Sequence, residues 1–199
     1  MNSRFTLLAI SFFIFGLSCN LLLGQKASYK ILVGGIEVGI QRVHQQQIRE
    51  KIRIDIESKV HISMLVSYTI EYRQWAIYQD GFLQESKVEV IKNGKIHKST
   101  HTLWTGSHYR ITKDEKTSTL HQKIYYSGCL IYFTPPKNAA YKYSEAEGLL
   151  EPISKCYVTS FETKHPTENR TNEYYYKNGV LERTIIQDAL LKFKTQRLY

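Results

Sequence analysis

The sequence predicts an all-β protein in which a single, strongly curved antiparallel sheet forms an open half-barrel with few or very short helices. Ten of the eleven even-numbered positions from Ile52 to Tyr72 are apolar or aromatic, whereas ten of the eleven odd-numbered positions from Arg53 to Arg73 are polar. Strict alternation of this kind is typical of a strand with one buried face. Three Asp-Gly or Asn-Gly pairs also indicate tight hairpin turns, and helical patterns are scarce.

Residues 1–24 have the pattern of a secretory signal peptide, in which a basic residue precedes an apolar run. Arg4 supplies the positive charge, and the apolar run extends from Phe5 to Leu23. Gly24 is a small residue of the kind found at the last position before a cleavage site, so the sequence favours cleavage before Gln25. We therefore expect an exported protein, periplasmic or secreted, with a single domain over residues 25–199.

Two other fates of this segment stay open at this stage. Attachment of a lipid at Cys19 is disfavoured because Gly16 lies three residues earlier, where a lipoprotein signal carries a branched apolar residue. An uncut anchor is the other alternative, since the apolar run is about long enough to span a bilayer. Polar Ser11, Ser18 and Asn20 within the run weaken that interpretation.

The alternating segment from Ile52 to Tyr72 contains no Gly, Pro or Asn, and its buried parity never switches as it would across a two-residue hairpin loop. It is therefore one very long strand, or two strands joined by an odd-length loop or a bulge. A strand of that length has to bend around a core. Further strands are expected at residues 28–34, 37–45, 107–113, 117–126, 129–134, 155–163 and 189–198.

Three hairpin turns are predicted at residues 79–82, 92–95 and 177–180, because Asp-Gly and Asn-Gly readily adopt the positive φ angles of a type I′ turn. A two-residue turn also fixes the register of the strands beside it. The expected pairs include Ile91 with Ile96, Glu89 with Lys98, Tyr176 with Leu181 and Glu173 with Thr184.

Prolines mark residues 135–153 as the longest loop, and residues 163–172 form a second. The best helix candidate is a short turn at residues 144–150, which has a Ser-x-x-Glu capping pattern. Glu145, Glu147 and Glu151 lie close together in the first loop. We interpret them as a solvated acidic loop, with a glycosidase-like pair of carboxylates as the alternative.

Two cysteines, Cys129 and Cys156, remain after removal of the signal peptide. An even number in an oxidising compartment permits a disulfide, and each lies in a predicted strand. We favour a disulfide between them, which requires the two strands to be neighbours. Two buried free thiols are the alternative.

The sequence contains seven histidines, of which His97 and His101 are expected on one face of a strand. They would lie about 13 Å apart, too far to share a metal ion without help from a residue such as His108. We interpret them as polar residues on a wet face and expect no metal ion and no cofactor. Because no Gly-x-Ser-x-Gly motif is present, we expect no catalytic residues and no enzymatic activity.

The aromatic side chains carry the remaining signal, with 15 Tyr, 8 Phe and 2 Trp. Those expected on the concave face of a curved sheet are Tyr68, Tyr72, Trp75, Tyr78, Trp104, Tyr132, Phe133 and Tyr176. They form either an ordinary packed core or, in part, an open site for an apolar or lipid-like ligand. They are therefore the candidate ligand-binding residues.

The formal net charge is +9 and falls to +8 without residues 1–24, where Arg4 is the only charged residue. A basic balance favours contact with anionic partners such as phospholipid headgroups at a membrane surface. A role of the net positive charge in keeping the protein soluble is an equally good explanation. Export removes the chain from nucleic acid, which is therefore not an expected partner, and the sequence does not predict the oligomeric state.

The order of several motifs along the chain resembles a domain-of-unknown-function family of exported bacteroidete proteins. The motifs are "YKILVGGIEVG", the long alternating segment, "DGFLQES", "LIYFTPP", "SEAEG", "NEYYYKNGVL" and a final basic strand, and together they span Tyr29 to Tyr199. More distantly, the plan is similar to periplasmic lipoprotein carriers with half-barrel sheets. The resemblance implies an exported, mostly antiparallel sheet and assigns no catalytic residue.

We therefore expect a non-enzymatic protein of the cell envelope that binds an apolar or lipid-like ligand in the concave face of its sheet. The alternative is a protein–protein interaction or structural module with a fully packed core. Such a module would pair with an envelope partner through a sheet edge or an aromatic surface.

Overall fold

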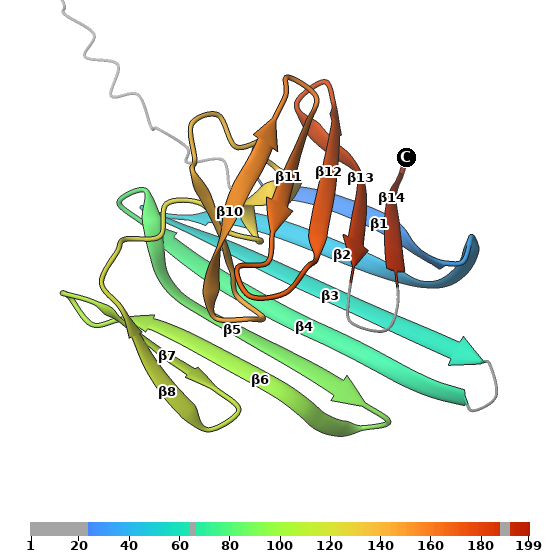
Figure 1. Cartoon of the computed structure of the whole chain (residues 1–199), viewed down its shortest axis with the longest axis horizontal. Coiled ribbons are helices and arrows are strands. Elements are labelled where there is room, and N and C mark those ends of the chain that lie inside the picture. The colour runs from blue at the N-terminus through green and yellow to red at the C-terminus, as the bar shows by residue number, and fades with distance from the viewer. Residues whose placement is uncertain (1–23, 64–66, 188–191) are drawn as a thin grey trace, which may run out of the picture.

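The computed structural model describes residues 24–63, 67–187 and 192–199, and its strands form one antiparallel sheet (Figure 1). The first eight strands are β1 (Gln25–Val33), β2 (Ile36–Ile48), β3 (Lys51–Ser63), β4 (Ser67–Gln79), β5 (Phe82–Lys92), β6 (Lys95–Trp104), β7 (Tyr109–Lys113) and β8 (Lys116–Leu120). The remaining six are β9 (Tyr141–Ser144), β10 (Leu149–Cys156), β11 (Ser160–Lys164), β12 (Thr171–Lys177), β13 (Val180–Gln187) and β14 (Lys192–Leu198). A single turn of 3₁₀ helix, η1 (Leu130–Tyr132), lies between the two groups.

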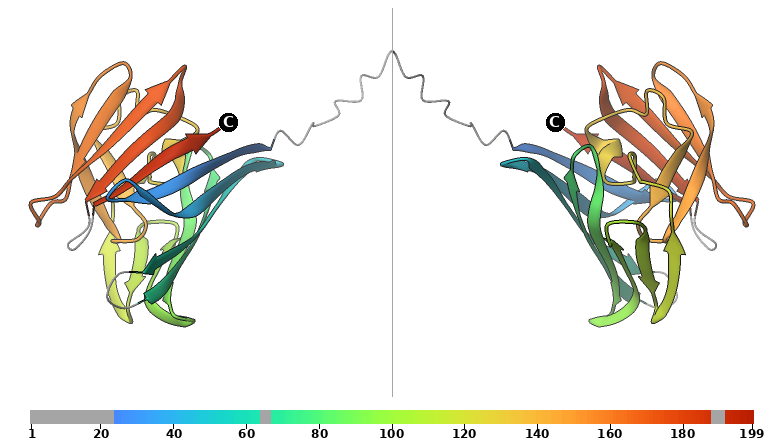
Figure 2. Two further views of the ribbon diagram at one scale, coloured as in Figure 1. Left: turned by 90° about the vertical axis from the view of Figure 1, so that its right-hand side faces the viewer. Right: turned by 90° about the vertical axis from the view of Figure 1, so that its left-hand side faces the viewer.

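Each group of strands is a meander, and the two meanders meet where β1 pairs with β14. The order across the sheet runs from β8 down to β1, then from β14 down to β9, so β8 and β9 are the edges and the sheet does not close into a barrel. Figure 2 shows the second meander bending out of the plane of the first. The predicted class, a curved antiparallel sheet in an open half-barrel, is confirmed.

The long alternating segment forms two paired strands, β3 and β4. Ser63 lies opposite Ser67, so an odd number of residues, 64–66, separates the strands, and Ile62 lies opposite Tyr68. This spacing explains why the buried parity never switches. The second of the two predicted arrangements is therefore the one adopted.

The three predicted hairpin turns are present. Positive φ angles occur at Asp80 and Gly81 (55° and 78°), at Asn93 and Gly94 (49° and 79°), and at Asn178 and Gly179 (53° and 77°). A fourth turn of the same kind, at Gly34 and Gly35, joins β1 to β2. Each of these hairpins is closed by a two-residue loop, because glycine, asparagine and aspartate adopt positive φ angles at little cost.

All four of these hairpins contain a bulge at the same distance from the turn. One residue lies unpaired three positions after the second turn residue, and these residues are Val38, Gln84, His97 and Glu182. Only the first predicted pairs, Ile91 with Ile96 and Tyr176 with Leu181, are therefore confirmed. Beyond the bulges the predicted pairs are wrong, since Lys98 lies opposite Val90 and Glu173 lies opposite Ile185. A bulge increases the local twist, which helps these hairpins to curve.

Several predicted elements around the prolines are wrong. Residues 129–134 contain η1 and no strand, and the predicted loop at 135–153 contains β9 and half of β10. The predicted strand at 155–163 is the end of β10, a turn and the start of β11. Pro152 is tolerated within β10 because residues 149–152 pair with β9 only, while β11 pairs from residue 153 onward. Residues 144–150 form a tight turn in which Gly148 N–H donates to the Ser144 carbonyl at 2.8 Å.

The concave face is filled by large side chains from both meanders. Its most deeply buried members include Tyr29, Leu83, Tyr109, Tyr143, Phe161, Tyr174 and Leu181. Four residues from the connection between β8 and β9 complete the cluster, namely Ile124, Tyr126, Cys129 and Ile131. Since burying one large apolar side chain stabilises a fold by roughly 1.5–3 kcal/mol, this connection is part of the core and not a surface loop.

The predicted signal peptide lies outside the described residues except for Gly24, and so does the possible lipid-attachment residue Cys19. Within the described ranges, no helix is long and apolar enough to cross a membrane.

Candidate functional site

One opening remains at the end of the concave face where β1 begins and β14 ends. It is a shallow, open pocket of about 240 Å³, and we call it the mouth pocket. Its lining includes Lys26, Ala27, Tyr132, Phe133, Val180 and Arg197. These residues come from β1, from the end of η1, from the β12–β13 turn and from β14, so the pocket exists only once both meanders have met.

Arg197 is placed at the mouth pocket by the central strand pair. It lies directly opposite Tyr29, whose side chain is buried in the core, so both residues face the concave side. Among the described residues, no ion pair or hydrogen bond engages the Arg197 side chain. The nearby carboxylate of Glu182 instead accepts a hydrogen bond from the Tyr199 hydroxyl at 2.5 Å. The half-buried guanidinium is therefore available to an anion.

The opposite wall of the mouth pocket is aromatic. The Tyr132 ring packs against Tyr29 with 5.5 Å between centroids, and the Gln41 side chain donates to the Tyr132 hydroxyl. Burial raises the pKa of Tyr29 to about 12, while the positive charge of Arg197 opposes that rise. Phe133 continues the wall. The pocket thus combines an apolar surface with two basic residues, of which Lys26 is exposed and Arg197 is half-buried.

The structure separates the eight aromatic residues that the sequence placed together. Six of them pack in or against the main core, namely Tyr72, Tyr78, Trp104, Tyr132, Phe133 and Tyr176. Tyr68 packs in a smaller cluster with Val60 and Ile62. Only Tyr132 and Phe133 reach the mouth pocket. Most of the candidate residues therefore form packed core.

The expected position of Trp75 on the concave face is wrong. Its neighbours Gln74 and Ala76 are buried on that face, so Trp75 projects to the other side of β4. There it lies opposite Asp55, and the Arg53 guanidinium lies 5.3 Å from its ring centroid. The Trp75 ring therefore lies on the convex face, where it forms a cation–π contact with Arg53.

A second group of reactive side chains is buried inside the core, around Glu145. Its carboxylate accepts hydrogen bonds from the backbone N–H groups of Gly128 and Cys129, both at 3.0 Å, and from the Ser127 hydroxyl. The Tyr78 hydroxyl contacts the same serine. Only 2% of Glu145 is exposed, so its charge is satisfied by these donors and not by solvent.

The Cys129 thiol in this group is not an activated nucleophile. Burial raises its pKa well above the ordinary value, and the Glu145 carboxylate raises it further. Gln74 donates to the sulfur at 2.8 Å. A protonated, buried thiol is inert, because the thiolate is the reactive form. We therefore interpret the group as a polar layer of the core.

The expected disulfide between Cys129 and Cys156 is wrong, since both are free. Cys129 precedes η1 and points into the core, whereas Cys156 is exposed at the end of β10 and donates to the Pro136 carbonyl at 3.4 Å. The prediction failed because it placed Cys129 in a strand. Cys129 instead lies directly before η1, outside any strand.

The interpretation of residues 145–151 as a solvated acidic loop is wrong, since two of its three glutamates are buried and Glu147 is only partly exposed. Glu145 and Glu151 are only 2% and 3% exposed. Glu151 forms an ion pair of 2.8 Å with buried Lys142, and Lys142 also donates to the Tyr174 hydroxyl at 2.9 Å. Burial lowers the pKa of Lys142, but Tyr174 and Glu151 outweigh this effect, so the pKa lies above its ordinary value.

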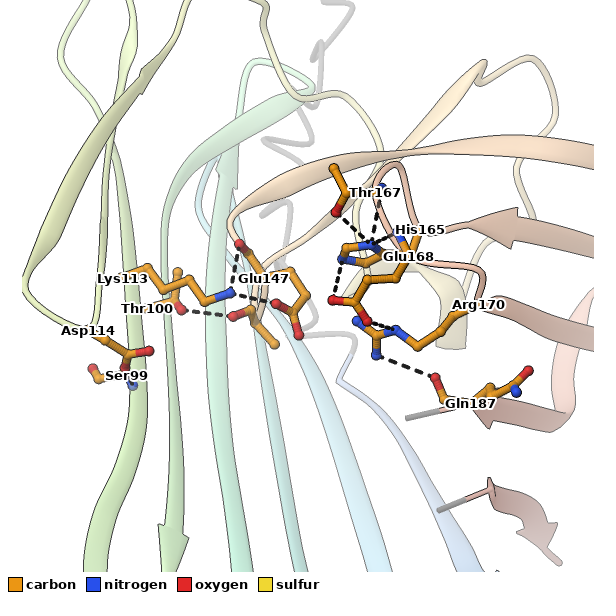
Figure 3. A network of polar contacts seen from close by, with 11 residues as sticks. Ser99, Thr100, Lys113, Asp114, Glu147, His165, Thr167, Glu168, Arg170 and Gln187 are labelled. Carbon is orange, nitrogen blue, oxygen red and sulfur yellow. Dashed lines mark hydrogen bonds and ion pairs between the residues drawn. The ribbon is translucent and has the colours of Figure 1, made fainter. Parts of the chain in front are cut away.

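The third glutamate, Glu147, belongs to a network at the gap between the two sheet edges (Figure 3). It pairs with Lys113 at 2.6 Å. Burial raises its pKa, but Lys113, Lys98 and Arg170 outweigh burial and hold the pKa below its ordinary value. The three glutamates therefore bind different partners.

The other half of this network lies between β11 and β12. Glu168 pairs with Arg170 at 2.6 Å and approaches His165 at 3.9 Å, and Arg170 also contacts the Gln187 carbonyl (Figure 3). Beside Glu147 is a second open pocket of about 360 Å³, which we call the seam pocket. Its lining includes Ile111, Lys113, Lys116, Ser118, Glu147 and Gly148. In the described ranges, no group of three His, Cys, Asp or Glu side chains is arranged to hold a metal ion.

Comparison with solved structures shows the fold of this chain in another protein. The crystal structure of a beta-barrel-like protein of domain of unknown function DUF1849 from Brucella abortus superposes with a TM-score of 0.54. The match covers 89% of this chain and 96% of that chain, at 9% sequence identity, so the likeness concerns the fold alone. No curated protein matches this chain.

The family model described as Domain of unknown function (DUF6134) matches residues 29–197, which is most of the chain and nearly all of the sheet. The protein therefore belongs to the DUF6134 family.

Proposed function

We propose that this protein is a non-enzymatic binding protein of an exported compartment, and that it holds the anionic end of a small amphipathic molecule in the mouth pocket. The observation that carries the proposal is Arg197, a concave-face guanidinium with no ion-pair partner among the described residues, set against the aromatic wall of Tyr132 and Phe133. A guanidinium binds carboxylate and phosphate groups through charge-assisted hydrogen bonds.

The size of the mouth pocket limits what it can enclose. Pockets for drug-sized ligands measure roughly 300–1,000 Å³, and this one measures about 240 Å³. The concave face beside the mouth pocket is occupied by the protein's own side chains, and the seam pocket lies apart from it at β8. The ligand is therefore held by one end, and the remainder of it lies outside the pocket.

Two features of the sequence support this assignment. The predicted signal peptide at residues 1–24 would take the chain to compartments rich in lipids, and the net charge of +9 favours anionic ligands and membrane surfaces. The resemblance to periplasmic lipoprotein carriers that the sequence motifs suggested would favour the same ligand class. No catalytic step is proposed, because the buried acid and thiol are closed off in the core.

Binding of matched twelve-carbon amphiphiles to the purified protein tests the proposal. We expect dodecanoate or dodecyl phosphate to bind in calorimetric titrations and uncharged dodecanol to bind at least tenfold more weakly, since a hydrogen bond to a charged group contributes about 1.5–3 kcal/mol. The two anions distinguish a carboxylate ligand from a phosphate ligand. Arg197→Gln should weaken the preference for the anion, because only Lys26 then supplies a positive charge at the pocket.

Arg110→Gln is the matched control, because Arg110 is an exposed arginine on β7 far from the mouth pocket. It removes the same charge and should leave binding unchanged. If none of the amphiphiles binds, or if both arginine variants weaken binding equally, the proposal is wrong. The packed concave face would then favour a protein–protein interaction module.

A further inference from the structure

The two edge strands of the sheet, β8 and β9, differ in whether their outer side is hydrogen-bonded to another segment. The β9 edge is covered, because Tyr143 N–H donates to the Tyr126 carbonyl and Gly128 N–H donates to the Tyr143 carbonyl, both at 2.9 Å. The β8 edge pairs with β7 on one side and, among the described residues, with no strand on the other. Its residues Lys116 to Thr119 are exposed and Leu120 is half-buried. The structure thus leaves one edge open.

The open edge is protected only in part against pairing with another chain, by its short length and by Lys116 at its start. Proteins usually protect such edges with proline, bulges or charged side chains, since unpaired backbone N–H and C=O groups otherwise accept a new strand. From Thr117 to Leu120 there is no proline and no charge, and the pairing with β7 runs without a bulge. Threonine also has a high preference for strands.

The seam pocket adds a place for a side chain of the incoming strand. Ile111 of β7 is buried on the concave side. Ser118 of β8 lies opposite Ile111, and Lys116 lies opposite Lys113, so Ser118 and Lys116 also face the concave side. The pocket lies over them, between β8 and the turn that contains Gly148. An inward side chain of a strand added beside β8 would therefore reach this pocket.

We propose that β8 pairs with β8 of a second copy of this chain, in an antiparallel arrangement around a twofold axis at Ser118. This register is chosen because it alone pairs all five residues of both strands. It places Ser118 opposite itself, Thr117 opposite Thr119, and Lys116 opposite Leu120. Thr–Thr pairs stabilise sheets, and no like charges face each other across the strands.

The same register adds a second contact for Leu120, which is half-buried against the core of its own chain. Leu120 lies opposite Tyr109 and so faces the concave side. In the second copy it would sit beside Lys116, at the lining of the seam pocket, where Ile111 and the Lys116 side-chain stem offer apolar contact. Glu115 and His121 flank the strand and would also face each other with compatible polarity. The contact is isologous, so each copy contributes the same residues and the assembly closes at two chains.

The association should be weak, because two five-residue strands bury less than the roughly 1,000 Å² expected of a stable interface. Sedimentation velocity of the full protein over a wide concentration range is the first measurement. We expect the mean mass to rise from one chain toward two as concentration increases. A mass of one chain at every concentration would overturn the proposal.

Charge substitutions at the twofold axis make the test specific. Ser118→Lys and Ser118→Glu each place like charges opposite themselves, so each variant alone should remain a single chain. An equimolar mixture of the two should recover the two-chain species, because opposite charges then meet. Recovery in the mixture cannot arise from misfolding of either variant.

Ser67→Lys and Ser67→Glu are the matched controls, since Ser67 is an exposed serine near the start of β4, away from β8. They should associate like the unmodified chain. Association that is unaffected by the Ser118 variants, equally disturbed by the Ser67 variants, or not recovered in the mixture would show that the contact lies elsewhere. The result is independent of the mouth pocket, which is at β1 and β14.

Discussion

Arg197 and Glu145 show how two charged side chains on the concave side can have opposite roles. Glu145 is enclosed, and its carboxylate accepts hydrogen bonds from Ser127, Gly128 and Cys129. Removing any of these donors would leave a buried charge partly unpaired, which is costly. Arg197 lies at an opening, and no described residue neutralises it. The first residue therefore fixes the core, while the second is available for recognition.

Gly128→Ala should destabilise the protein by about 1–3 kcal/mol, because it disturbs a buried charged hydrogen-bond network. A Cβ at this position would lie 2.7 Å from a Glu145 carboxylate oxygen, so the carboxylate would have to leave its donors. Urea unfolding measures the change. In a Glu145→Ala background the same glycine substitution should cost much less. Equal costs in both backgrounds would mean that the carboxylate is not the obstacle.

At the scale of the strand, the repeated bulge is the feature that shapes the hairpins. Each of four type I′ turns is followed by one unpaired residue, and the extra residue switches which positions face the core. In β5, for example, the bulged residue is Gln84. Leu83 is buried on one side of it, and Ser86 and Val88 are buried on the other side, so the buried positions change from odd to even numbers. The bulges therefore reconcile a tight turn with a sheet that must curve.

The strands of the first meander also approach each other closely at Gly39, the residue after the Val38 bulge. A Cβ at Gly39 would lie 2.1 Å from the Lys59 carbonyl oxygen and 2.9 Å from the Val60 Cα. These are backbone atoms of β3, which cannot move without breaking the pairing. Gly39→Ala should therefore cost more than about 3 kcal/mol or prevent folding.

Arg42→Ala on the same strand is the control for Gly39→Ala. Arg42 is exposed, so its loss should change the free energy of unfolding by less than about 0.5 kcal/mol. Thermal or urea unfolding of both variants gives the comparison. A Gly39 variant as stable as the Arg42 variant would show that β2 and β3 can separate without loss of pairing.

The elements that could be predicted from the sequence are those specified locally. The alternation from Ile52 to Tyr72 and the Asp-Gly and Asn-Gly turns each fix their own segment, so they identified strands and turns correctly. The bulge at His97 was not predicted, because no glycine or proline marks residues 95–98, although the other three hairpins have a bulge at the same distance from the turn. Pro152 was misleading, since it can lie in a strand only where one side of the strand is unpaired.

The candidate site depends on the whole molecule and was predicted only in part. Tyr132 and Phe133 were identified as aromatic residues, but Arg197 was not, because its placement beside the pocket requires the pairing of β1 with β14. A signal for it was available, since Phe193, Thr195 and Arg197 alternate with polar residues near the end of the chain. The burial of Glu145 and Glu151 was not predicted, because it depends on contacts with Ser127 and Lys142 that form only in the folded chain.

The whole core contains many buried tyrosines, which should make the protein sensitive to alkali. Burial raises the pKa of Tyr29 and of Tyr109 to about 12, whereas a tyrosine in an unfolded chain has a pKa of about 10. The folded state therefore favours the neutral phenol. This contribution to stability is complete below about pH 10 and is lost as the pH rises through about 12.

Phenolate absorbance and circular dichroism recorded during an alkaline titration test this expectation. Ionisation of the buried tyrosines should be delayed beyond pH 10 and should coincide with loss of the sheet signal, since each buried phenolate disfavours the fold. Tyr29→Phe should retain the fold, because the ring remains, although it loses the hydrogen bond from the hydroxyl to the Leu181 carbonyl. Full ionisation near pH 10 with the sheet intact would contradict the burial of these side chains.

The pairing of β1 with β14 has a consequence for how the chain can be assembled. The strand that begins at residue 25 and the strand that ends at residue 198 are neighbours in the middle of the sheet. A nascent chain that has emerged only as far as β13 would hold two half-sheets with no strand pairing between them. Completion of the sheet must therefore wait for residues 192–198, and during that interval β1 and β13 would each have one unpaired side that is vulnerable to aggregation.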